Sequence, residues 1–484
     1  MGATDATVFF NFVGLQQAAL GAGLREVIEP ATGQVLCSVG IANAADMAQA
    51  TAAAAAAQKA WALVPPREKA AIFRRAGALF EKHFDELALY TARETGGILA
   101  KGQHEVREAA LICQLAANLP LQTQGHVLPS VPGRTSCARR VPHGVVGVIS
   151  PFNFPLILAL RAIAPALAAG NGVVVKPDSR TPVSGGLMIA RIFAEAGLPK
   201  GLLQALPGDA EAGEALVVDP LVPMIAFTGS VAVGRRIGEL AGRHLKKVSL
   251  ELGGANSLLI LDDADLDVAA CNAAWGAYFH QGQICMASNR ILVHASMVAE
   301  FTKRLVSKAT HLPMGDGASG QVALGPLIDA KQRDRVHAMV QDSVKAGAKL
   351  EAGGSYEGLF YKPTVLSGVK PGVRVFEEET FGPVANIITY HTDEEAIALA
   401  NNNTGSLASA VISKSVGRAM AVAQQLKSGM VHINDQTVND DCVNPFGGPG
   451  IAGNGCSVGG PADMEEYTQW QWVTVKDQAP TYPF

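Results

Sequence analysis

Short apolar runs alternate with helical stretches in the middle of the chain. Each run is rich in β-branched residues and too short for a helix, whereas the stretches between them have the length and the periodicity of helices. The runs are Val145–Ser150, Gly172–Lys176, Leu202–Leu206 and Ile225–Phe227, and the helical stretches are Leu156–Ala169, Ser184–Ala196 and Ala210–Val217. Strands that alternate with helices predict βαβ units on a parallel sheet.

The same texture returns after Glu251, with expected strands at 258–261, 290–293 and 385–389, and it predicts a second α/β unit. The last stretch, Tyr467–Lys476, is rich in β-branched and aromatic residues and predicts a strand. A strand at the chain end needs a sheet to join, in this subunit or in a neighbour.

The N-terminal part of the chain is expected to be helical. Ala44–Ala62 is alanine-rich, and Asn43 is a suitable N-cap for it. Arg67–Gly96 continues with helical periodicity, and its apolar stripe consists of Ile72, Leu79, Phe80 and Leu87.

Size and charge narrow the class of protein. A chain of 484 residues is too long for one ordinary hydrophobic core. Its composition, with 48% hydrophobic and 17% charged residues, is that of a globular protein. The net charge of −4 gives no reason to expect a nucleic acid partner. Arg161 breaks the apolar region 156–169, so we expect no membrane span, and Met1–Gln17 lacks the pattern of a secretory signal, which favours the cytoplasm.

The seven cysteines are scattered, without a CxxC pair or a Cys/His cluster of zinc spacing, so we expect neither a disulfide framework nor a metal site. Cys285, in the segment YFHQGQICMA, lies near Gly282 and Gln283, with small Ala287 after it; covalent catalysis on an aldehyde needs a thiol that can lose its proton and an open approach. A buried structural cysteine is the alternative for each of the seven. His280 is interpreted as a packing or surface histidine, and Cys442 and Cys456 receive no role.

Three further segments carry candidate chemistry. Glu251 stands in the apolar run LELGG, where burial would raise its pKa toward that of a general base, although a paired or capping glutamate fits equally well. Asn153 in SPFNFP could donate to an oxyanion or serve as a turn residue. The segment FTGSVAVG, at 227–234, indicates a strand, a turn and a helix start, which could hold a pyrophosphate or be an ordinary turn.

Taken together, these segments resemble the aldehyde dehydrogenase superfamily in order and spacing over nearly the whole chain. The matching motifs are GVVGVISPFNFP, VVVKP, FTGSVAVG, LELGG, GQICMA, EEETFGPV and NPFGG. The stretch from Asn256 to Ser288 most resembles bacterial benzaldehyde dehydrogenases. The resemblance implies an α/β fold with a Rossmann-like cofactor domain (1–120 and 142–252), an α/β catalytic domain (253–466) and a small oligomerisation sheet (121–141 and 467–484).

The resemblance also implies a role for each matched residue. Cys285 would be the nucleophile, Glu251 the base that activates the hydrolytic water, and Asn153 an oxyanion donor together with the Cys285 backbone amide. The residues implied for binding the NAD(P) cofactor are Lys176, Ser179, Gly229, Ser230, Gly234, Glu379 and Phe381. Those implied to line the substrate tunnel are Phe154, Ile157, Leu158, Arg161, Phe279, Ile284 and Met286.

The sequence departs from the family pattern in ways that bear on specificity. Ser179 stands where many NAD-preferring members have glutamate, and Arg180 follows it, so we expect NAD while NADP stays open. The 449–452 segment (PGIA) differs from the commoner pattern at the substrate entrance. Arg161 could recognise a polar substituent or form a structural ion pair, and the second alternative is favoured.

The expected function is the oxidation of an aromatic, benzaldehyde-like aldehyde to its acid through a thiohemiacetal and a thioester on Cys285. The alternatives are a dehydrogenase for vanillin-like or aliphatic aldehydes, and a non-catalytic protein that kept the fold. Glu251 disfavours a CoA-acylating enzyme, and ester hydrolysis is expected only as a side activity of the thiol. The terminal strand predicts a homodimer or a homotetramer.

Overall fold

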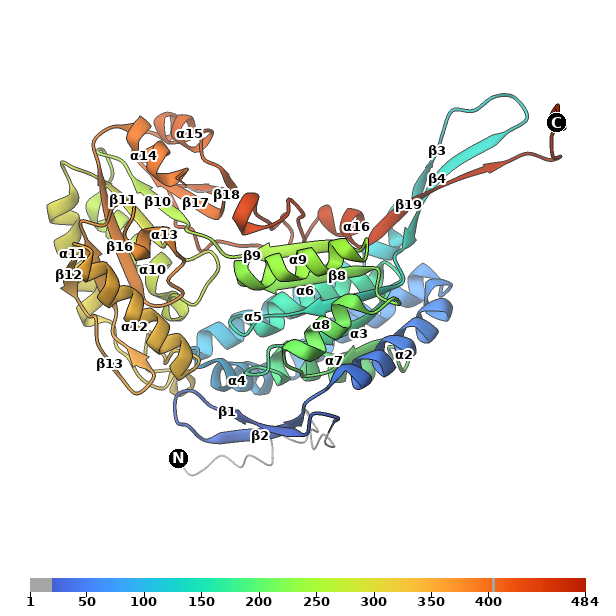
Figure 1. Ribbon diagram of the computed structural model, residues 1–484, viewed down its shortest axis with the longest axis horizontal. Coiled ribbons are helices and arrows are strands. Elements are labelled where there is room, and N and C mark those ends of the chain that lie inside the picture. Colours follow the sequence, from blue (N-terminus) through green and yellow to red (C-terminus); the bar gives the residue numbers. More distant parts are fainter. Residues whose placement is uncertain (1–19, 403–404) are drawn as a thin grey trace.

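The computed structural model describes residues 20–402 and 405–484. Residues 1–19 of the predicted cofactor domain, which include the whole segment Met1–Gln17 that was assessed for a signal, lie outside the described residues. Two α/β lobes stand side by side, and a β arm projects from one of them (Figure 1). Within the described ranges, none of the helices has both the length and the apolar character needed to cross a bilayer.

The first lobe is built on a five-stranded parallel sheet in the order β7-β6-β5-β8-β9. Both faces are covered, as runs of apolar residues without polar alternation require. Val146 and Val148 pack with helix α6 on one face, whereas Val145 and Ile149 pack with α2 and α8 on the other. The strands are β5 (Val145–Ile149), β6 (Gly172–Lys176), β7 (Leu203–Ala205), β8 (Met224–Gly229) and β9 (Lys247–Leu252).

Helices surround this sheet and extend the lobe toward the N-terminus. They are α2 (Ala44–Ala62), α3 (Pro66–Lys82), α4 (Phe84–Thr95), α5 (Leu99–Ala116), α6 (Pro155–Ala168), α7 (Met188–Glu195), α8 (Ala210–Val218) and α9 (Val231–Arg243). Asn43 caps α2 as predicted, and Asp46 completes a reciprocal capping box. The single helix expected over Arg67–Gly96 is wrong, because the backbone leaves the helical region at His83 and divides α3 from α4.

The second lobe contains a seven-stranded sheet in the order β12-β15-β16-β11-β10-β17-β18, in which only the pairing of β12 with β15 is antiparallel. Its strands are β10 (Ser257–Ile260), β11 (Arg290–His294), β12 (Lys349–Ala352), β15 (Thr364–Ser367), β16 (Val384–Tyr390), β17 (Ser406–Ile412) and β18 (Ser428–Ile433). Its helices are α10 (Leu266–Tyr278), α11 (Val298–His311), α12 (Ala330–Lys345), α13 (Arg374–Glu377), α14 (Asp393–Ala400) and α15 (Val416–Ala423). The second α/β unit is therefore present as predicted.

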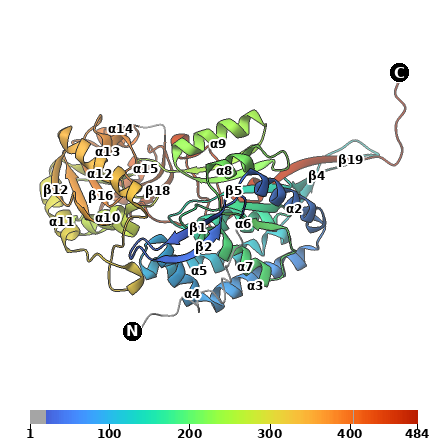
Figure 2. The same cartoon turned by 60° about the horizontal axis from the view of Figure 1, so that its bottom comes forward.

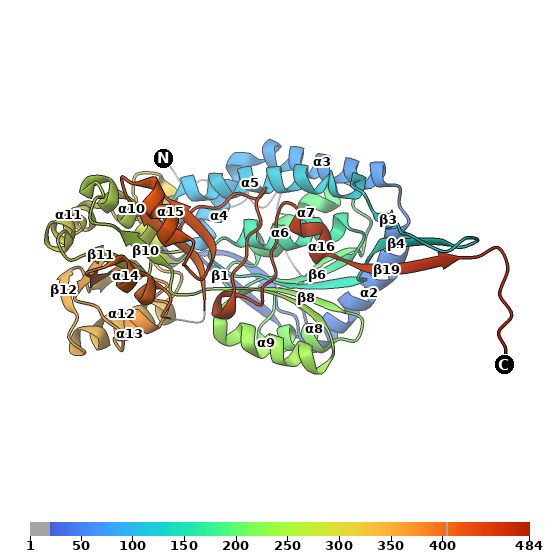
Figure 3. The ribbon, with the colours of Figure 1, turned by 90° about the horizontal axis from the view of Figure 1, so that it is seen from above.

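Two antiparallel elements lie outside the main sheets. Strand β19 (Thr468–Val475) pairs with β4 (Thr135–Pro142), which pairs with β3 (Gly125–Val127), and this sheet forms the arm that carries the C-terminus away from the body (Figure 3). The hairpin of β1 (Leu24–Ile28) and β2 (Val35–Gly40) lies at the lower side of Figure 1 and comes forward in Figure 2. The exact domain boundaries given above stay a prediction.

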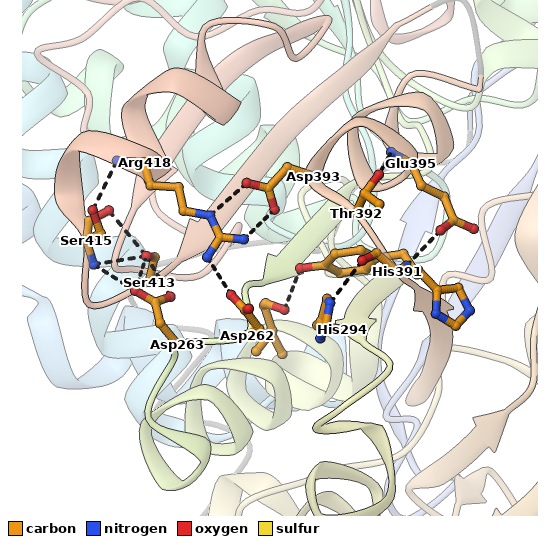
Figure 4. Close-up of polar contacts among 12 residues, drawn as sticks. Asp262, Asp263, His294, His391, Thr392, Asp393, Glu395, Ser413, Ser415 and Arg418 are labelled. Atoms are coloured by element: carbon orange, nitrogen blue, oxygen red, sulfur yellow. Dashed lines mark hydrogen bonds and ion pairs between the residues drawn. The ribbon is translucent and has the colours of Figure 1, made fainter.

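The outer edge of the seven-stranded sheet, where its parallel strands end, is closed by polar contacts (Figure 4). Arg418 makes two bonds of 2.7 Å to the Asp393 carboxylate and also contacts Asp262, while Ser413 donates to Asp263 over 2.8 Å. Carboxyl edges of parallel sheets commonly bind ligands. At this edge the contacts of Arg418 and Ser413 join the chain segments that follow the strands.

Candidate active site

The predicted catalytic residues meet where the two sheets face each other. Asn153 follows β5 and Glu251 lies near the end of β9, so the first sheet contributes its carboxyl edge. Cys285 precedes β11 and Glu379 precedes β16, so the second sheet contributes its amino edge. The Asn153 side chain joins the two lobes, because it donates to the carbonyl of Gln283 over 2.9 Å.

A strained turn after α10 carries Cys285. His280, Gln281 and Gly282 all have positive φ angles, of 47°, 57° and 65°. A Cβ on Gly282 would lie 2.1 Å from the carbonyl oxygen of Gly382, so only glycine fits there. The Gln281 amide donates to Gly96 over 2.9 Å. Left-handed backbone at non-glycine residues persists only where the surroundings hold it, so the cysteine stands on a rigid support.

Asn256, a residue that the sequence reasoning missed, fixes the cysteine loop directly. Its buried amide donates to the carbonyl of Cys285 over 2.7 Å and to that of Ala287 over 3.1 Å. Its oxygen accepts the backbone N–H of Ala408 over 2.9 Å. The only sequence signal was an amide inside an otherwise apolar run, where a buried polar group must have partners.

A second missed group supports Asn153 from behind. The buried ion pair of Lys101 and Glu105 has an N–O distance of 2.5 Å, and Lys101 lies over the Phe154 ring at 4.7 Å. Glu105 also accepts the first N–H groups of α6, from Leu156 at 3.0 Å and Ile157 at 3.3 Å. A carboxylate at a helix N-terminus is stabilised by the helix dipole, so this group anchors the segment that carries Asn153.

His280 lies beside this group and is a packing residue rather than a surface one. Its side chain is buried, and its ring centroid is 5.3 Å from that of Phe154 in an edge-on arrangement. Burial, followed by the nearby Lys101 ammonium, lowers the pKa of His280 well below its usual value. A neutral imidazole is therefore expected at neutral pH.

The Cys285 thiol has a raised pKa. Burial is the main cause, and the carboxylates of Glu379, Asp440 and Glu251 add to it. A raised pKa favours the thiol over the thiolate, so attack by the sulfur requires a group that accepts the proton.

Glu251 is 5% exposed, and its surroundings are mostly apolar. Its Oε1 atom accepts a hydrogen bond of 3.5 Å from the Cys456 thiol, and its Oε2 atom is buried without a hydrogen-bond partner. Burial raises the pKa of Glu251 well above the usual value, whereas the Cys456 contact and the Arg161 charge lower it. A carboxyl group with a raised pKa can exchange protons near neutral pH, as a general base must.

The C-terminal loop, residues 434–461, contacts the edge of β9 beside Glu251. The side chain of Asn454 accepts from the backbone N–H of Leu250 over 3.0 Å and donates to the carbonyl of Val248 over 2.9 Å. Gly453 forms a bridge with Glu251 itself. The last part of the chain thus pairs with the edge of β9 as a short strand would.

A cavity of about 310 Å³ lies beside Glu251. Of the predicted substrate residues, Leu158 and Arg161 line it, and Ile284 lines a second cavity of about 240 Å³ beside Glu379. Phe154, Ile157, Phe279 and Met286 pack in or against the core of the first lobe. The larger cavity is otherwise walled by Ala162, Ala226, Phe227, Thr228, Ser249, Phe446, Val458 and Tyr467.

Arg161 forms the ion pair that the sequence favoured. Its guanidinium is bound to the Asp440 carboxylate at 2.8 and 2.9 Å, and it lies 4.9 Å from the centroid of the Phe446 ring. Its side chain is 4% exposed while its Nε atom has no hydrogen-bond partner. One donor of a buried cation is therefore left over at the cavity.

Glu379 has the features of a residue that binds a hydroxyl group. Its Oε1 atom is buried without a hydrogen-bond partner, and burial raises its pKa to about 8. A Cβ on Gly253 would lie 2.4 Å from the Glu379 carboxylate oxygens, so any larger residue at this position would displace that carboxylate. Phe381 has a φ of 52°, and its ring meets the Phe152 ring edge-on at 5.7 Å. An orphaned acceptor of this kind fits a ribose hydroxyl.

The remaining cofactor candidates lie along the carboxyl edge of the first sheet. The half-buried Lys176 ammonium donates to the carbonyls of Gly208 and Pro177 at 3.0 and 3.1 Å. Ser230 caps the N-terminus of α9 over 3.5 Å, after Gly229 ends β8. Gly234 serves packing, since its Cβ would lie 2.4 Å from a Leu252 methyl group.

Arg180 is already occupied by two carboxylates. It makes bonds of 2.8 and 2.9 Å to Asp178 and one of 2.9 Å to Asp329, and its guanidinium lies 4.1 Å from the Phe152 ring centroid. Ser179 contacts Asp209, which is itself paired with Arg25. Two aspartates cancel the charge that would attract a 2′-phosphate. Among residues 20–402 and 405–484, no group of three His, Cys, Asp or Glu is arranged to hold a metal ion.

Comparison with known proteins points to one family. The model of the aldehyde dehydrogenase family matches residues 19–473. The chain is 52% identical to the vanillin dehydrogenase of an Amycolatopsis species, over 98% of this chain and 97% of that one. It is 47% identical to the NAD⁺-dependent benzaldehyde dehydrogenase of Pseudomonas putida, over 96% and 95% of the two chains.

Solved structures are similar over the same length. The betaine aldehyde dehydrogenase of Staphylococcus aureus, in complex with NAD⁺, superimposes with a TM-score of 0.95 at 29% identity, with 99% of each chain covered. An NAD-dependent aldehyde dehydrogenase from Sinorhizobium meliloti gives a TM-score of 0.92 at 32% identity, with 96% of this chain and 94% of that chain covered.

Proposed function

Because the chain belongs to the aldehyde dehydrogenase family, we propose that it oxidises an aromatic aldehyde to the carboxylic acid with NAD as the oxidant. The observation that carries the proposal is the way in which the facing edges of the two sheets bring Asn153, Glu251 and Cys285 together. Asn153 donates across the lobes to Gln283, two residues before Cys285, over 2.9 Å, and Asn256 holds the Cys285 carbonyl over 2.7 Å.

Cys285 is the nucleophile in this proposal. Its sulfur forms a bond to the aldehyde carbon as the thiol proton leaves to a nearby base, and the carbonyl oxygen becomes an oxyanion. Asn153 stabilises that oxyanion: its amide carries two N–H groups, and only one is required for the bond to Gln283. Loss of such a donor costs about 3 kcal/mol at the transition state.

Glu251 completes the reaction as the base for hydrolysis. The oxidised substrate is held as a thioester on Cys285, and a water molecule must lose a proton in order to attack it. Glu251 takes that proton, and the acid leaves as the Cys285 sulfur regains its own. The raised pKa of Glu251 suits this role, because a base works best when its pKa lies near the working pH.

The cofactor lies in this proposal along Lys176, Ser179, Gly229 and Ser230, with Glu379 and Phe381 at its nicotinamide end. Bound NAD supplies the acceptor for the hydride that leaves the substrate carbon. Two observations favour NAD over NADP. The Pseudomonas putida relative is named as an NAD⁺-dependent enzyme, and the Arg180 charge is already paired with Asp178 and Asp329.

The preference for aromatic aldehydes rests on the relatives named above and on the cavity walls. Phe446 and Val458 present an apolar surface on which a flat ring can lie. A vanillin-like aldehyde is the second candidate, favoured by the 52% identity to a vanillin dehydrogenase and by the unpartnered Nε of Arg161, which could donate to a ring hydroxyl.

An oligomer in the cytoplasm is the proposed working form. Strand β19 is an edge strand that exposes Trp470 and Trp472, at 48% and 65%, and a second subunit could cover them in a dimer or a tetramer. All seven cysteines are free, which fits a reducing compartment.

The test follows NAD(P)H by absorbance with benzaldehyde, vanillin and hexanal, each with NAD and with NADP. We expect turnover with NAD and an aromatic aldehyde, and its loss in Cys285→Ala. Cys271→Ala, which removes an exposed thiol from α10, is the matched control and should remain active. A Cys285→Ala enzyme with wild-type turnover, or a wild type that favours hexanal, would refute the corresponding part of the proposal.

A further inference from the structure

One face of strand β9 carries a row of polar side chains. Lys247, Ser249 and Glu251 alternate with Val248 and Leu250. Because successive side chains of a strand point to opposite faces, the three polar groups share a face. The row begins near the surface, where the Lys247 side chain is 35% exposed, and ends at the buried Glu251.

Groups from the C-terminal segment bridge the gaps in this row. The Ser249 hydroxyl donates to the Cys456 sulfur over 3.2 Å, and the Cys456 thiol donates to Oε1 of Glu251 over 3.5 Å. The Glu466 carboxyl group is a second acceptor for the same hydroxyl, whose single proton serves one partner at a time, and it lies 3.3 Å from the Lys247 ammonium. A connected chain of groups with exchangeable protons therefore runs from Glu251 to Lys247.

The cavity beside Glu251 offers few other acceptors for a proton. Its other polar side chains are those of Arg161, Thr228 and Tyr467. Arg161 keeps its proton at any working pH and is bound to Asp440. The Tyr467 hydroxyl is buried, and burial raises its pKa well above the usual value, so it does not become an anion that could take up a proton. Ala162, Phe446 and Val458 complete the wall with apolar groups.

We propose that Cys456 and Ser249 form a proton exit that carries the proton taken up by Glu251 to the buried Glu466, beside the half-exposed Lys247. The inference rests on the proposed function, because only a catalytic base must be emptied after each turnover. Cys456 and Ser249 act through Glu251 and are positioning residues, since neither touches the reacting atoms.

The proton count balances along this route. While Glu251 is a carboxylate, the thiol donates to Glu251 and the Ser249 hydroxyl donates to the Cys456 sulfur. When Glu251 is protonated, the thiol and hydroxyl hydrogens turn outward, as freely rotating S–H and O–H groups can. Protonated Glu251 then gives its proton to the Cys456 sulfur, while the thiol proton passes to the Ser249 oxygen and the hydroxyl proton passes to Glu466. Each intermediate group receives one proton and loses one, so thiol and hydroxyl end unchanged. Glu251 becomes a carboxylate, and protonated Glu466 releases its proton to water beside Lys247. No oxidant or reductant takes part.

The charges around the route fit this direction of transfer. The groups that face Glu251 are Arg161 from α6, Asp440 from the C-terminal loop, Glu466 from α16 (Ala462–Glu466) and the Cys456 thiol. Burial and the Glu251 charge raise the pKa of Cys456 to about 12, so the sulfur does not stay a thiolate and takes up a proton from Glu251 as it gives its own to Ser249. At the exit, burial raises the pKa of Glu466, and the Lys247 ammonium partly offsets this rise.

The experiment compares Cys456→Ala, Cys456→Ser and Ser249→Ala in the full-length enzyme, with Cys113→Ala as a control for the loss of a buried thiol. Two quantities are measured with benzaldehyde and NAD: the size of the first burst of NADH, and the steady-state rate over a pH series in H₂O and D₂O. The burst reports thioester formation, whereas the steady-state rate reports the release that requires an emptied base.

In Cys456→Ala and in Ser249→Ala we expect an unchanged burst and a steady-state rate that is about tenfold lower. This loss is smaller than the full contribution of an acid–base group to the rate, because Glu251 itself remains. The loss should shrink at high pH, where hydroxide can take the proton, and the solvent isotope effect should change. Cys456→Ser should recover most of the rate, because a hydroxyl also relays protons, and Cys113→Ala should match wild type.

Each contrary outcome has a distinct meaning. If the wild-type enzyme turns over and Cys456→Ala and Ser249→Ala have the same steady-state rate as the wild type, the proton exit is refuted and the proposed function stands. The same holds if Cys456→Ser is as slow as the alanine variant at every pH, which would mark a packing role. A wild type that forms no NADH from any aldehyde would overturn the proposed function and the exit with it. If Cys456→Ala fails to fold, Ser249→Ala decides.

Discussion

Replacement of Asn256 by alanine should loosen the cysteine loop and lower both stability and activity. The side chain makes three hydrogen bonds, of 2.7, 3.1 and 2.9 Å, to the carbonyls of Cys285 and Ala287 and to the N–H of Ala408. At about 1 kcal/mol for each bond the loss is about 3 kcal/mol, and carbonyls left buried without partners raise it toward 5 kcal/mol.

The effect on activity follows from geometry. The carbonyl of Cys285 is one of the two held by Asn256, so the loss of its anchor displaces the sulfur itself. A displacement of about 1 Å can reduce a rate by about a hundredfold. We expect kcat to fall by this order, with a smaller change in KM for the aldehyde, since Asn256 does not line the cavity beside Glu251.

Urea unfolding and burst kinetics together test this reasoning. Asn272→Ala is the matched control, because its amide makes one exposed bond of 2.9 Å, to Val268. Asn256→Ala should unfold at a clearly lower urea concentration, and its burst should be slower rather than smaller. An Asn256→Ala enzyme as stable as Asn272→Ala, with an unchanged burst rate, would refute the assignment of Asn256 as the anchor of the loop.

Three further expectations concern charge. Glu251→Gln should give a burst of NADH followed by a steady-state rate lower by about a hundredfold. In the wild type, kcat should fall as the pH drops through the raised pKa of Glu251. A variant with the same pH profile as the wild type would contradict the base role. Because burial raises the pKa of Glu379 to about 8, the folded state holds that proton more tightly than the unfolded chain, and stability is lost as the pH rises toward that value. Glu379→Gln should therefore show a smaller loss of stability in urea titrations between about pH 6 and about pH 9, and equal slopes for the two proteins would contradict this. Asp440→Asn should destabilise the fold by about 3 kcal/mol, since it leaves the Arg161 charge buried without a counterion, and the double variant R161M/D440N should recover most of the loss in thermal unfolding; a double variant less stable than Asp440→Asn would count against the ion-pair account.

Much of the fold could be predicted because its signals are local. The strands of the first lobe were recognisable as short β-branched runs, and Asn43 could be identified as a cap from its place before an alanine-rich stretch. The break at His83 was not visible, because Phe80 and Leu87 continue the same apolar stripe on both sides of it. Periodicity indicates which face of a helix is buried, and it does not change at a kink that keeps the same face buried.

The site was predictable only in part. Short segments and a family resemblance pointed to Cys285 and Glu251, but not to their supports. Asn256 lies 29 positions from Cys285, and Cys456 lies 205 positions from Glu251. Such contacts depend on how two sheets and a terminal loop come together, and no local pattern encodes them. Cys456 received no role from the sequence, although the structure places its thiol on the Glu251 carboxylate.

The pairing of the C-terminal loop with β9 affects when the enzyme can acquire its activity during synthesis. A nascent chain that has left the ribosome only as far as β18 already contains Asn153, Glu251 and Cys285. It still lacks the Asn454 and Gly453 contacts that hold the edge of β9, and the Phe446 wall of the cavity. The proposed site is thus completed by residues that are translated after all three of its proposed catalytic residues, so that a product stalled at β18 would carry those side chains without a formed site.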